Sequence, residues 1–246
     1  GEIKEQAFFV FYGNGANGKS VLVNLLRNIL GTLTGSVAQD AFILKRNGNS
    51  LNPSLVNVKD TRMAFVSEGN NGQEMDSALI KSISGGDDVQ ARELYKGFIS
   101  LNPHFKIFIT TNYMPAINFA DDAMLRRTKI IRFENQFTGD KCDYEIPAKL
   151  QAEAEGISYA VKYYQEGLAP YEPESISLNY NRCRAENDSI FSFICDYVQQ
   201  SDDDKNYIQS SVLYNYYIVY CQTIGKKPES QKTFTQELHK QGYHSQ

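Results

Sequence analysis

A glycine-rich segment between a strand pattern and a helix pattern is the feature that most constrains this chain. Its letters, GNGANGKS at residues 13–20, match G-x-x-x-x-G-K-S, the pattern of a phosphate-binding loop. The apolar run at 8–12 predicts a buried strand before it, and residues 21–30 carry apolar side chains at helical spacing after it. Glycines let backbone N–H groups curl towards a phosphate, and the start of the helix adds a favourable dipole. The sequence therefore predicts a nucleotide site on an α/β fold.

Each residue type in this loop has an expected task. Lys19 is expected to reach the β- and γ-phosphates, and the Ser20 hydroxyl to bind Mg²⁺. The residues expected to contact the nucleotide are Gly13, Asn14, Gly15, Ala16, Asn17, Gly18, Lys19, Ser20 and Val21. ATP with Mg²⁺ is the expected ligand. The alternative interpretation is a glycine-rich turn before an ordinary helix.

Composition narrows the class of protein. A length of 246 residues suggests one large domain, or one with a small satellite, and the net charge of −4 means that any nucleic-acid contact needs a local basic feature. The four cysteines are widely spaced without a C-x-x-C pattern, which argues against a zinc site and fits a reducing cytosol. No apolar run is long enough for a bilayer, and no signal peptide is present. Because Gly1 stands almost directly before the first predicted strand, we expect a fragment of a longer protein.

Polar side chains close two further predicted strands. The apolar segments that predict these and one more strand are 61–68, 106–112 and 129–133, and residues 75–84 predict a helix. Short apolar strands separated by helices are typical of a parallel sheet, which binds ligands at the carboxyl ends of its strands. Glu68 and Asn112 stand at such ends, so we expect them to converge with the loop on one site.

These polar residues each have two interpretations. Glu68 either polarises the water that attacks the γ-phosphate and helps to hold Mg²⁺, or is a solvated residue at a strand end. Asn112 either bonds the γ-phosphate or the attacking water, or forms a turn before Pro115. Arg126 and Arg127 either end a solvated helix, or include an arginine finger that reaches the nucleotide of a neighbouring subunit.

Taken in order, these segments resemble the superfamily 3 helicases. The resemblance rests on GNGANGKS, on FVSE at 65–68, on KSISGGDDVQARELYK at 81–96, on ITTN at 109–112 and on LRR at 125–127. It is closest to the phage and plasmid primase–helicase group that includes the poxvirus-type enzymes, strongly over residues 8–133 and more loosely beyond. It implies an AAA+ ATPase fold, homo-hexameric rings and ATP-driven translocation on single-stranded DNA during replication.

The resemblance also assigns a DNA contact and shows one departure. In that family the Gly-Gly-Asp segment and its continuation form a hairpin that faces the ring pore, so Arg92 and Lys96 become the expected contacts to the DNA backbone. The usual Asp-Glu pair of the second motif is Ser67-Glu68 here, so metal binding would depend more on Ser20. The family's primase half and helical collar have no counterpart in this chain.

The resemblance and the composition together predict three parts. They are an AAA+ P-loop core at 1–135, a helical extension and linker at 136–186, and a helical module at 187–246. Helices are predicted at 146–167, 187–200, 210–224 and 230–241. The module resembles a winged helix whose wing, expected after Gly242, is truncated, and its last helix would present Lys232, Thr233, Gln236, His239 and Lys240 to DNA. The alternative is a packing satellite with a solvated charged face.

The leading hypothesis is the ATP-hydrolysing helicase motor of a phage or plasmid replication protein, acting in the bacterial cytoplasm without a membrane. One alternative is an AAA+ ATPase that remodels DNA or loads replication proteins without unwinding. The other is a nucleotide-stabilised DNA-binding scaffold without turnover. Intact Lys19, Ser20 and Glu68 argue against the scaffold.

Overall fold

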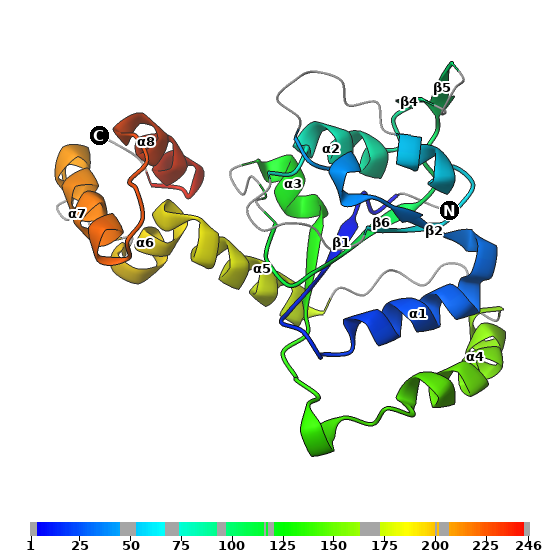
Figure 1. Cartoon of the computed structure of the whole chain (residues 1–246). Helices are drawn as coiled ribbons and strands as arrows, with labels where there is room; N and C mark the ends of the chain where they lie inside the picture. The colour runs from blue at the N-terminus through cyan, green and yellow to red at the C-terminus, as the bar shows by residue number, and fades with distance from the viewer. Residues whose placement is uncertain are drawn as a thin grey trace. The chain divides into compact units, whose positions relative to one another are not determined.

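A five-stranded sheet forms the centre of the first part of the chain (Figure 1). Its strands, in the spatial order β2-β3-β6-β1-β7, all pair in parallel. They are β1 (Phe8–Tyr12), β2 (Thr34–Val37), β3 (Met63–Val66), β6 (Lys106–Thr111) and β7 (Thr128–Arg132). The expected α/β fold with a parallel sheet is therefore confirmed.

The computed structural model describes residues 4–44, 53–66, 74–92, 97–115, 117, 121–162, 173–199, 201 and 207–243. Two units are present, Gly1–Asn179 and Tyr180–Gln246. The boundary lies inside helix α5 (Glu174–Asn187), within the segment that the sequence assigns to an extension and linker. The 3₁₀ turns of the first unit are η1 (Gly31–Leu33), η2 (Gln39–Ala41), η3 (Pro53–Val58) and η4 (Gly139–Lys141).

Helices cover both faces of the sheet (Figure 1). On one face lies α1 (Lys19–Leu30), against which α4 (Ile146–Lys162) packs. On the other lie α2 (Ser77–Gly85) and α3 (Asp122–Arg127). The helix expected at 75–84 is thus present as α2.

Aromatic side chains fill the space between the sheet and α1. Phe9 on β1 is the register partner of Phe108 on β6, and their rings stack with centroids 4.8 Å apart. Phe11 and Phe65 also contact the Phe108 ring, and Val23 of α1 closes the same cluster. Because successive side chains of a strand point to opposite faces, Phe8 and Val10 face the other layer, where both are fully buried.

An antiparallel hairpin precedes β6. It consists of β4 (Val89–Arg92) and β5 (Phe98–Leu101), with Arg92 paired with Phe98 at the open end. Val89, Ala91 and Leu101 are buried. The hairpin that the resemblance implies is therefore present, and its connecting residues 93–96 lie outside the described residues.

The strand order creates a switch point beside the predicted loop. The connection that leaves β1 passes β6 and β3 to reach β2, whereas the connection that leaves β6 passes β1 to reach β7. These two neighbouring strands thus send their connections in opposite directions. In open parallel sheets ligands bind outside the carboxyl ends of two such strands.

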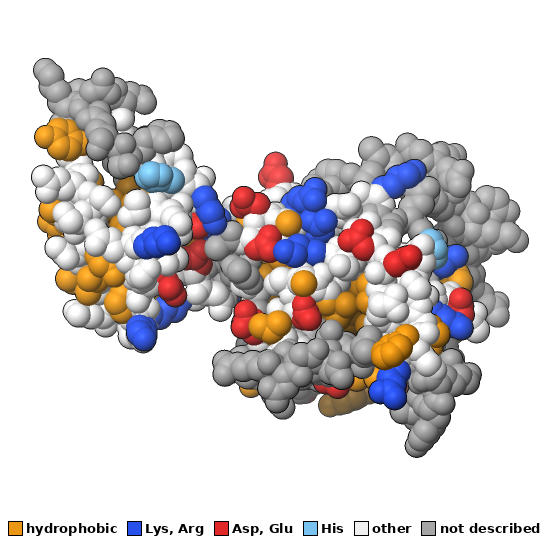
Figure 2. All heavy atoms as spheres, turned by 90° about the horizontal axis from the view of Figure 1, so that it is seen from above, with side chains coloured by type: hydrophobic (Ala, Val, Ile, Leu, Met, Phe, Trp, Pro, Cys, Tyr) orange, Lys and Arg blue, Asp and Glu red, His pale blue; other side chains and the backbone are white. Residues whose placement is uncertain are grey.

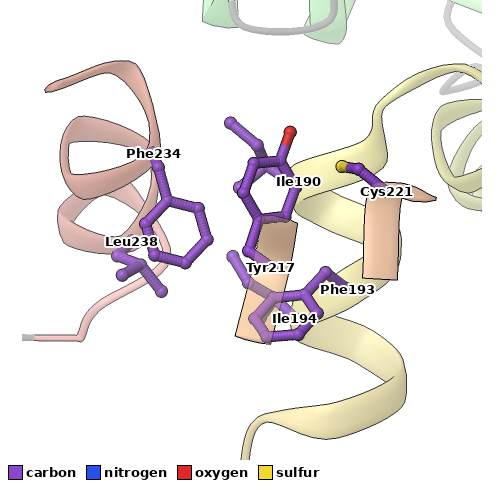
Figure 3. Close-up of a cluster of buried hydrophobic side chains, with 7 residues drawn as sticks. All are labelled: Ile190, Phe193, Ile194, Tyr217, Cys221, Phe234 and Leu238. Carbon is purple, nitrogen blue, oxygen red and sulfur yellow. The ribbon is translucent and has the colours of Figure 1, made fainter. Parts of the chain in front are cut away.

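The second unit is built from helices. They are α6 (Ser189–Tyr197), α7 (Ser210–Thr223) and α8 (Gln231–Lys240), preceded by the end of α5. Figure 3 shows its core, where Phe234 and Leu238 of α8 meet Tyr217 of α7 and Phe193 of α6. Of the tyrosines in α7, Tyr217 is fully buried whereas Tyr216 is 61 % exposed. No strand lies among residues 180–199, 201 and 207–243, so the winged-helix assignment stays a prediction.

Candidate nucleotide-binding site

Lys19 lies inside the predicted phosphate loop and is 4 % exposed. Its Nζ donates to the Gly13 carbonyl at 2.5 Å and to the Asn14 carbonyl at 3.3 Å. It also donates to Oδ1 of Asn17 at 3.1 Å and to Oδ1 of Asn112 at 3.0 Å. The loop and the end of β6, separated by more than ninety residues in sequence, therefore meet at one ammonium group.

Neutral oxygens are replaceable partners for a cation. Hydrogen bonds between ionised groups are about twice as strong as neutral ones, so a phosphate oxygen would displace a carbonyl or amide oxygen from Lys19. The donor set thus fits a phosphate: an ammonium group, a helix start and the loop amides around it. Ser20 is exposed in the first turn of α1, which suits a hydroxyl that is to reach a metal bound to the nucleotide.

Asn17 braces the loop from the other side. It is 6 % exposed, accepts from the Lys19 backbone N–H at 3.5 Å, and donates from Nδ2 to the Phe133 carbonyl at 3.2 Å. Gly13 permits this close approach, because its φ is +154° and a Cβ there would lie 2.4 Å from the Phe133 oxygen. The loop is therefore held between the end of β6 and the chain that follows β7.

Two expected site residues fall outside the described residues. Glu68 lies within 67–73 and Lys96 within 93–96. Their roles in water activation and DNA contact stay predictions. The β4 end of the hairpin is described, and there Arg92 is exposed and opposite Phe98, which is 66 % exposed.

The adjacent arginines at the end of α3 have opposite environments. Arg127 is 7 % exposed and donates to the Ala123 carbonyl and to Oε1 of Gln6, both at 3.0 Å. Burial, and after it the positive charge of Arg126, lowers the pKa of Arg127. Arg126 is exposed. Of the pair, only Arg126 is placed to reach another molecule.

An ion pair fixes the start of α3. Asp121 caps the helix by accepting from the Ala123 N–H at 2.9 Å, and its other oxygen accepts from Lys81 of α2 at 2.8 Å. The Lys81 hydrogen bond is the main reason why the pKa of Asp121 is lowered. This contact between α2 and α3 was not predicted, since nothing in the local sequence pairs residues forty positions apart.

The predicted DNA-facing residues of α8 share the exposed side of that helix. Phe234, Glu237 and Leu238 are buried. The exposed residues are Lys232, Thr233, Gln236, His239 and Lys240. Figure 2 shows that Lys and Arg side chains lie among Asp and Glu side chains on the face displayed. Any DNA contact would thus rest on local groups.

Within the described residues, no helix is long and apolar enough to cross a membrane.

Two family models match parts of the chain. Residues 11–127 match a family of unknown function, DUF5906, and residues 185–242 match the family described as poxvirus D5 protein-like. The first match spans the loop, Asn112 and the α3 arginines. The second covers most of the second unit.

Several viral proteins are similar in sequence. A protein of Acanthamoeba polyphaga mimivirus that carries a helicase name is 30 % identical over 237 residues, which is 87 % of this chain and 24 % of the relative. A helicase-named protein of frog virus 3 is 30 % identical over 51 % of this chain and 13 % of its own length. The fowlpox virus protein named Primase D5 is 30 % identical over 56 % of this chain and 18 % of its own length. The chain thus spans at most about a quarter of these three relatives.

A solved structure shares the fold. The apo structure of the NrS-1 C-terminal region superposes with a TM-score of 0.55 over 91 % of this chain and 59 % of that chain, at 14 % identity. The chain is therefore similar in sequence to viral proteins named helicase and primase, and in fold to the C-terminal region of NrS-1.

Proposed function

We propose that this chain contains the ATPase motor of a viral replication helicase, which hydrolyses ATP with Mg²⁺ to translocate on single-stranded DNA. The observation that carries this proposal is the contact between Lys19 and Asn112 at the switch point of the sheet. It joins an intact G-x-x-x-x-G-K-S loop to an amide at the position where a γ-phosphate would end. The helicase and primase names of the viral relatives support the choice of DNA as the substrate.

The chemistry assigned to the chain is positioning and charge stabilisation. The loop amides and Lys19 bind the β- and γ-phosphates, and Ser20 with Glu68 would hold Mg²⁺, which neutralises the developing negative charge. Glu68 polarises the attacking water. Asn112, which already bonds to Lys19, orients the γ-phosphate or that water.

The trans contact is assigned to Arg126. In a ring, one subunit completes the site of its neighbour only with a side chain that reaches beyond its own fold. Arg126 is exposed, whereas both terminal nitrogens of Arg127 are bonded inside their own unit. We therefore propose that the full-length protein assembles as a homo-hexamer in which Arg126 stabilises charge on the neighbouring nucleotide.

The grip on DNA is assigned to the β4–β5 hairpin, with Arg92 at its described end and Lys96 in its connection. Contacts from Lys and Arg to phosphates are independent of sequence and sensitive to salt, as a translocating motor requires. The exposed Phe98 opposite Arg92 adds a ring for stacking on bases.

Phosphate release measured with and without single-stranded DNA tests this function. The expected result is hydrolysis that DNA stimulates and that Lys19→Ala abolishes. Lys59→Ala is the matched control, because Lys59 is an exposed lysine of the same unit outside the loop. Hydrolysis with DNA stimulation but no strand separation would favour a remodelling ATPase. Binding of ATP without any turnover would favour a scaffold and overturn the motor.

A further inference from the structure

The chain that follows β7 runs along the outer side of the phosphate loop. The Phe133 N–H donates to the Tyr12 carbonyl at 2.8 Å, directly before the loop. Four residues later the Phe137 N–H donates to the Ala16 carbonyl at 2.7 Å, in the middle of the loop. Together with the Asn17 bond to Phe133, these contacts fix the backbone of Phe137 against the loop.

The ring of Phe137 remains accessible although its backbone is fixed. Phe137 is 46 % exposed, and its Cε2 lies 4.0 Å from the point where a Cβ on Gly18 would stand. An aromatic ring held beside a binding loop with part of its surface in water offers a flat apolar face to a planar ligand. Because the backbone is already ordered, stacking on this ring costs little additional entropy.

The sheet order tells which end of a nucleotide would meet this ring. In the sheet, β6 and β7 flank β1 on opposite sides. Asn112 extends from the β6 side and contacts Lys19, so in the function proposed above the γ-phosphate lies towards β6. The rest of the nucleotide then extends away from β6, towards the chain that follows β7 and carries Phe137.

We propose that Phe137 is the platform on which the base of the bound nucleotide stacks. This inference rests on the proposed function, which sets the direction of the triphosphate. A ring recognises a base through its π face and not through hydrogen bonds, so the site accepts ATP and GTP with similar affinity. Loss of one stacked ring is expected to weaken nucleotide binding about tenfold.

Calorimetric titration of the 246-residue chain with ATP and with inorganic tripolyphosphate separates the base from the phosphates. Phe137→Ala and Phe137→Leu are expected to weaken ATP binding about tenfold and to leave tripolyphosphate binding unchanged. Lys19→Ala is expected to weaken both ligands. Tyr144→Ala is the matched control, since Tyr144 lies in the same connecting segment and is 84 % exposed, and it is expected to alter neither.

A fluorescence measurement gives an independent readout. The chain contains no tryptophan, so Phe137→Trp introduces the only indole. Its emission is expected to change on addition of ATP or GTP and to stay constant with tripolyphosphate.

Three outcomes would overturn the proposal. Equal weakening of ATP and tripolyphosphate in Phe137→Ala would make Phe137 a support of the loop only. Unchanged ATP affinity in that variant, with a silent indole in Phe137→Trp, would remove the ring from the site. If the wild-type chain bound neither ligand, the loop would have no phosphate affinity, and the proposed function would fail together with this inference.

Discussion

Replacing Gly13 by alanine is the sharpest structural test of the loop. A Cβ at this position would lie 2.4 Å from the Phe133 carbonyl oxygen and 2.7 Å from Nδ2 of Asn17. Non-bonded heavy atoms are most stable about 3.5 Å apart, so the loop and Phe133 must separate by about 1 Å. The φ of +154° adds strain, because non-glycine residues rarely adopt it.

The expected cost follows from these contacts. Backbone strain of this kind costs about 1–3 kcal/mol, and losing the bond from Asn17 to Phe133 costs about 1 kcal/mol more. We therefore expect Gly13→Ala to lower the free energy of unfolding by about 2–4 kcal/mol, measured by urea denaturation. Because a misplacement of about 1 Å costs about 100-fold in rate, kcat/KM for ATP should fall by that order.

Gly15→Ala is the matched control for stability. A Cβ at Gly15 meets no atom within 4 Å, so its unfolding free energy should stay within about 0.5 kcal/mol of wild type. Equal stability and equal ATPase rates for Gly13→Ala and wild type would show that the loop is not pressed against Phe133, and would refute this account of the brace.

The remaining predictions concern chemistry, assembly and alkaline stability. Lys19→Ala should abolish ATP hydrolysis and weaken ATP binding, whereas Glu68→Gln should bind ATP without turning it over; near-normal phosphate release by Glu68→Gln would remove that residue from catalysis. Arg126→Ala should fold normally but hydrolyse ATP only when mixed with excess Lys19→Ala subunits, and no recovery in proven co-assemblies would contradict a trans role. Arg127→Ala should instead lower the melting temperature, because its two hydrogen bonds lie inside the unit. Burial raises the pKa of Tyr217 to about 12, so stability of the second unit should be complete below pH 10 and fall between about pH 10 and 12; Tyr217→Phe should remove that fall in a pH series of urea midpoints.

The sequence predicted those elements whose burial is visible in local letters. The run at 8–12 and the segment at 106–112 are apolar enough to indicate central strands, and they are β1 and β6. β2 was missed because only Val37 of its four residues is buried, so an edge strand left no apolar pattern. The predicted convergence of loop and strand end follows from parallel topology, and the structure places Lys19 and Asn112 in contact.

Helix α5 was missed for a different reason. Its sequence is polar and follows a proline-rich segment, and one of its buried residues is Arg184. A buried arginine is tolerated only with partners, and here Glu237 of α8 and Asp188 accept from it while its guanidinium lies over the Phe191 ring. Glu237 stands fifty-three residues away in sequence. Compensation over that distance cannot be seen in a local pattern.

The arginine pair shows the same limit within the site. Two adjacent identical letters carry the same prediction, and only the packing of α3 decides which side chain is buried. In the structure Gln6, at the opposite end of the sequence, accepts from Arg127 and so fixes it. The segment after β7 looked like a polar turn for a similar reason, because its contacts with the loop depend on pairing between β7 and β1.

The loop is held by the same two strands that carry the proposed moving parts. Asn112 ends β6, and β6 follows the β4–β5 hairpin after a connection of only four residues. On the other side, α3 with Arg126 runs directly into β7, whose continuation bonds to Asn17 and Ala16. Under the proposed function, a phosphate that replaces Asn112 or shifts Asn17 would act on strands joined almost directly to the DNA hairpin and to the trans arginine. Short rigid connections of this kind are a physical route for coupling hydrolysis to movement, since little free chain lies between the nucleotide contacts and the elements that would respond.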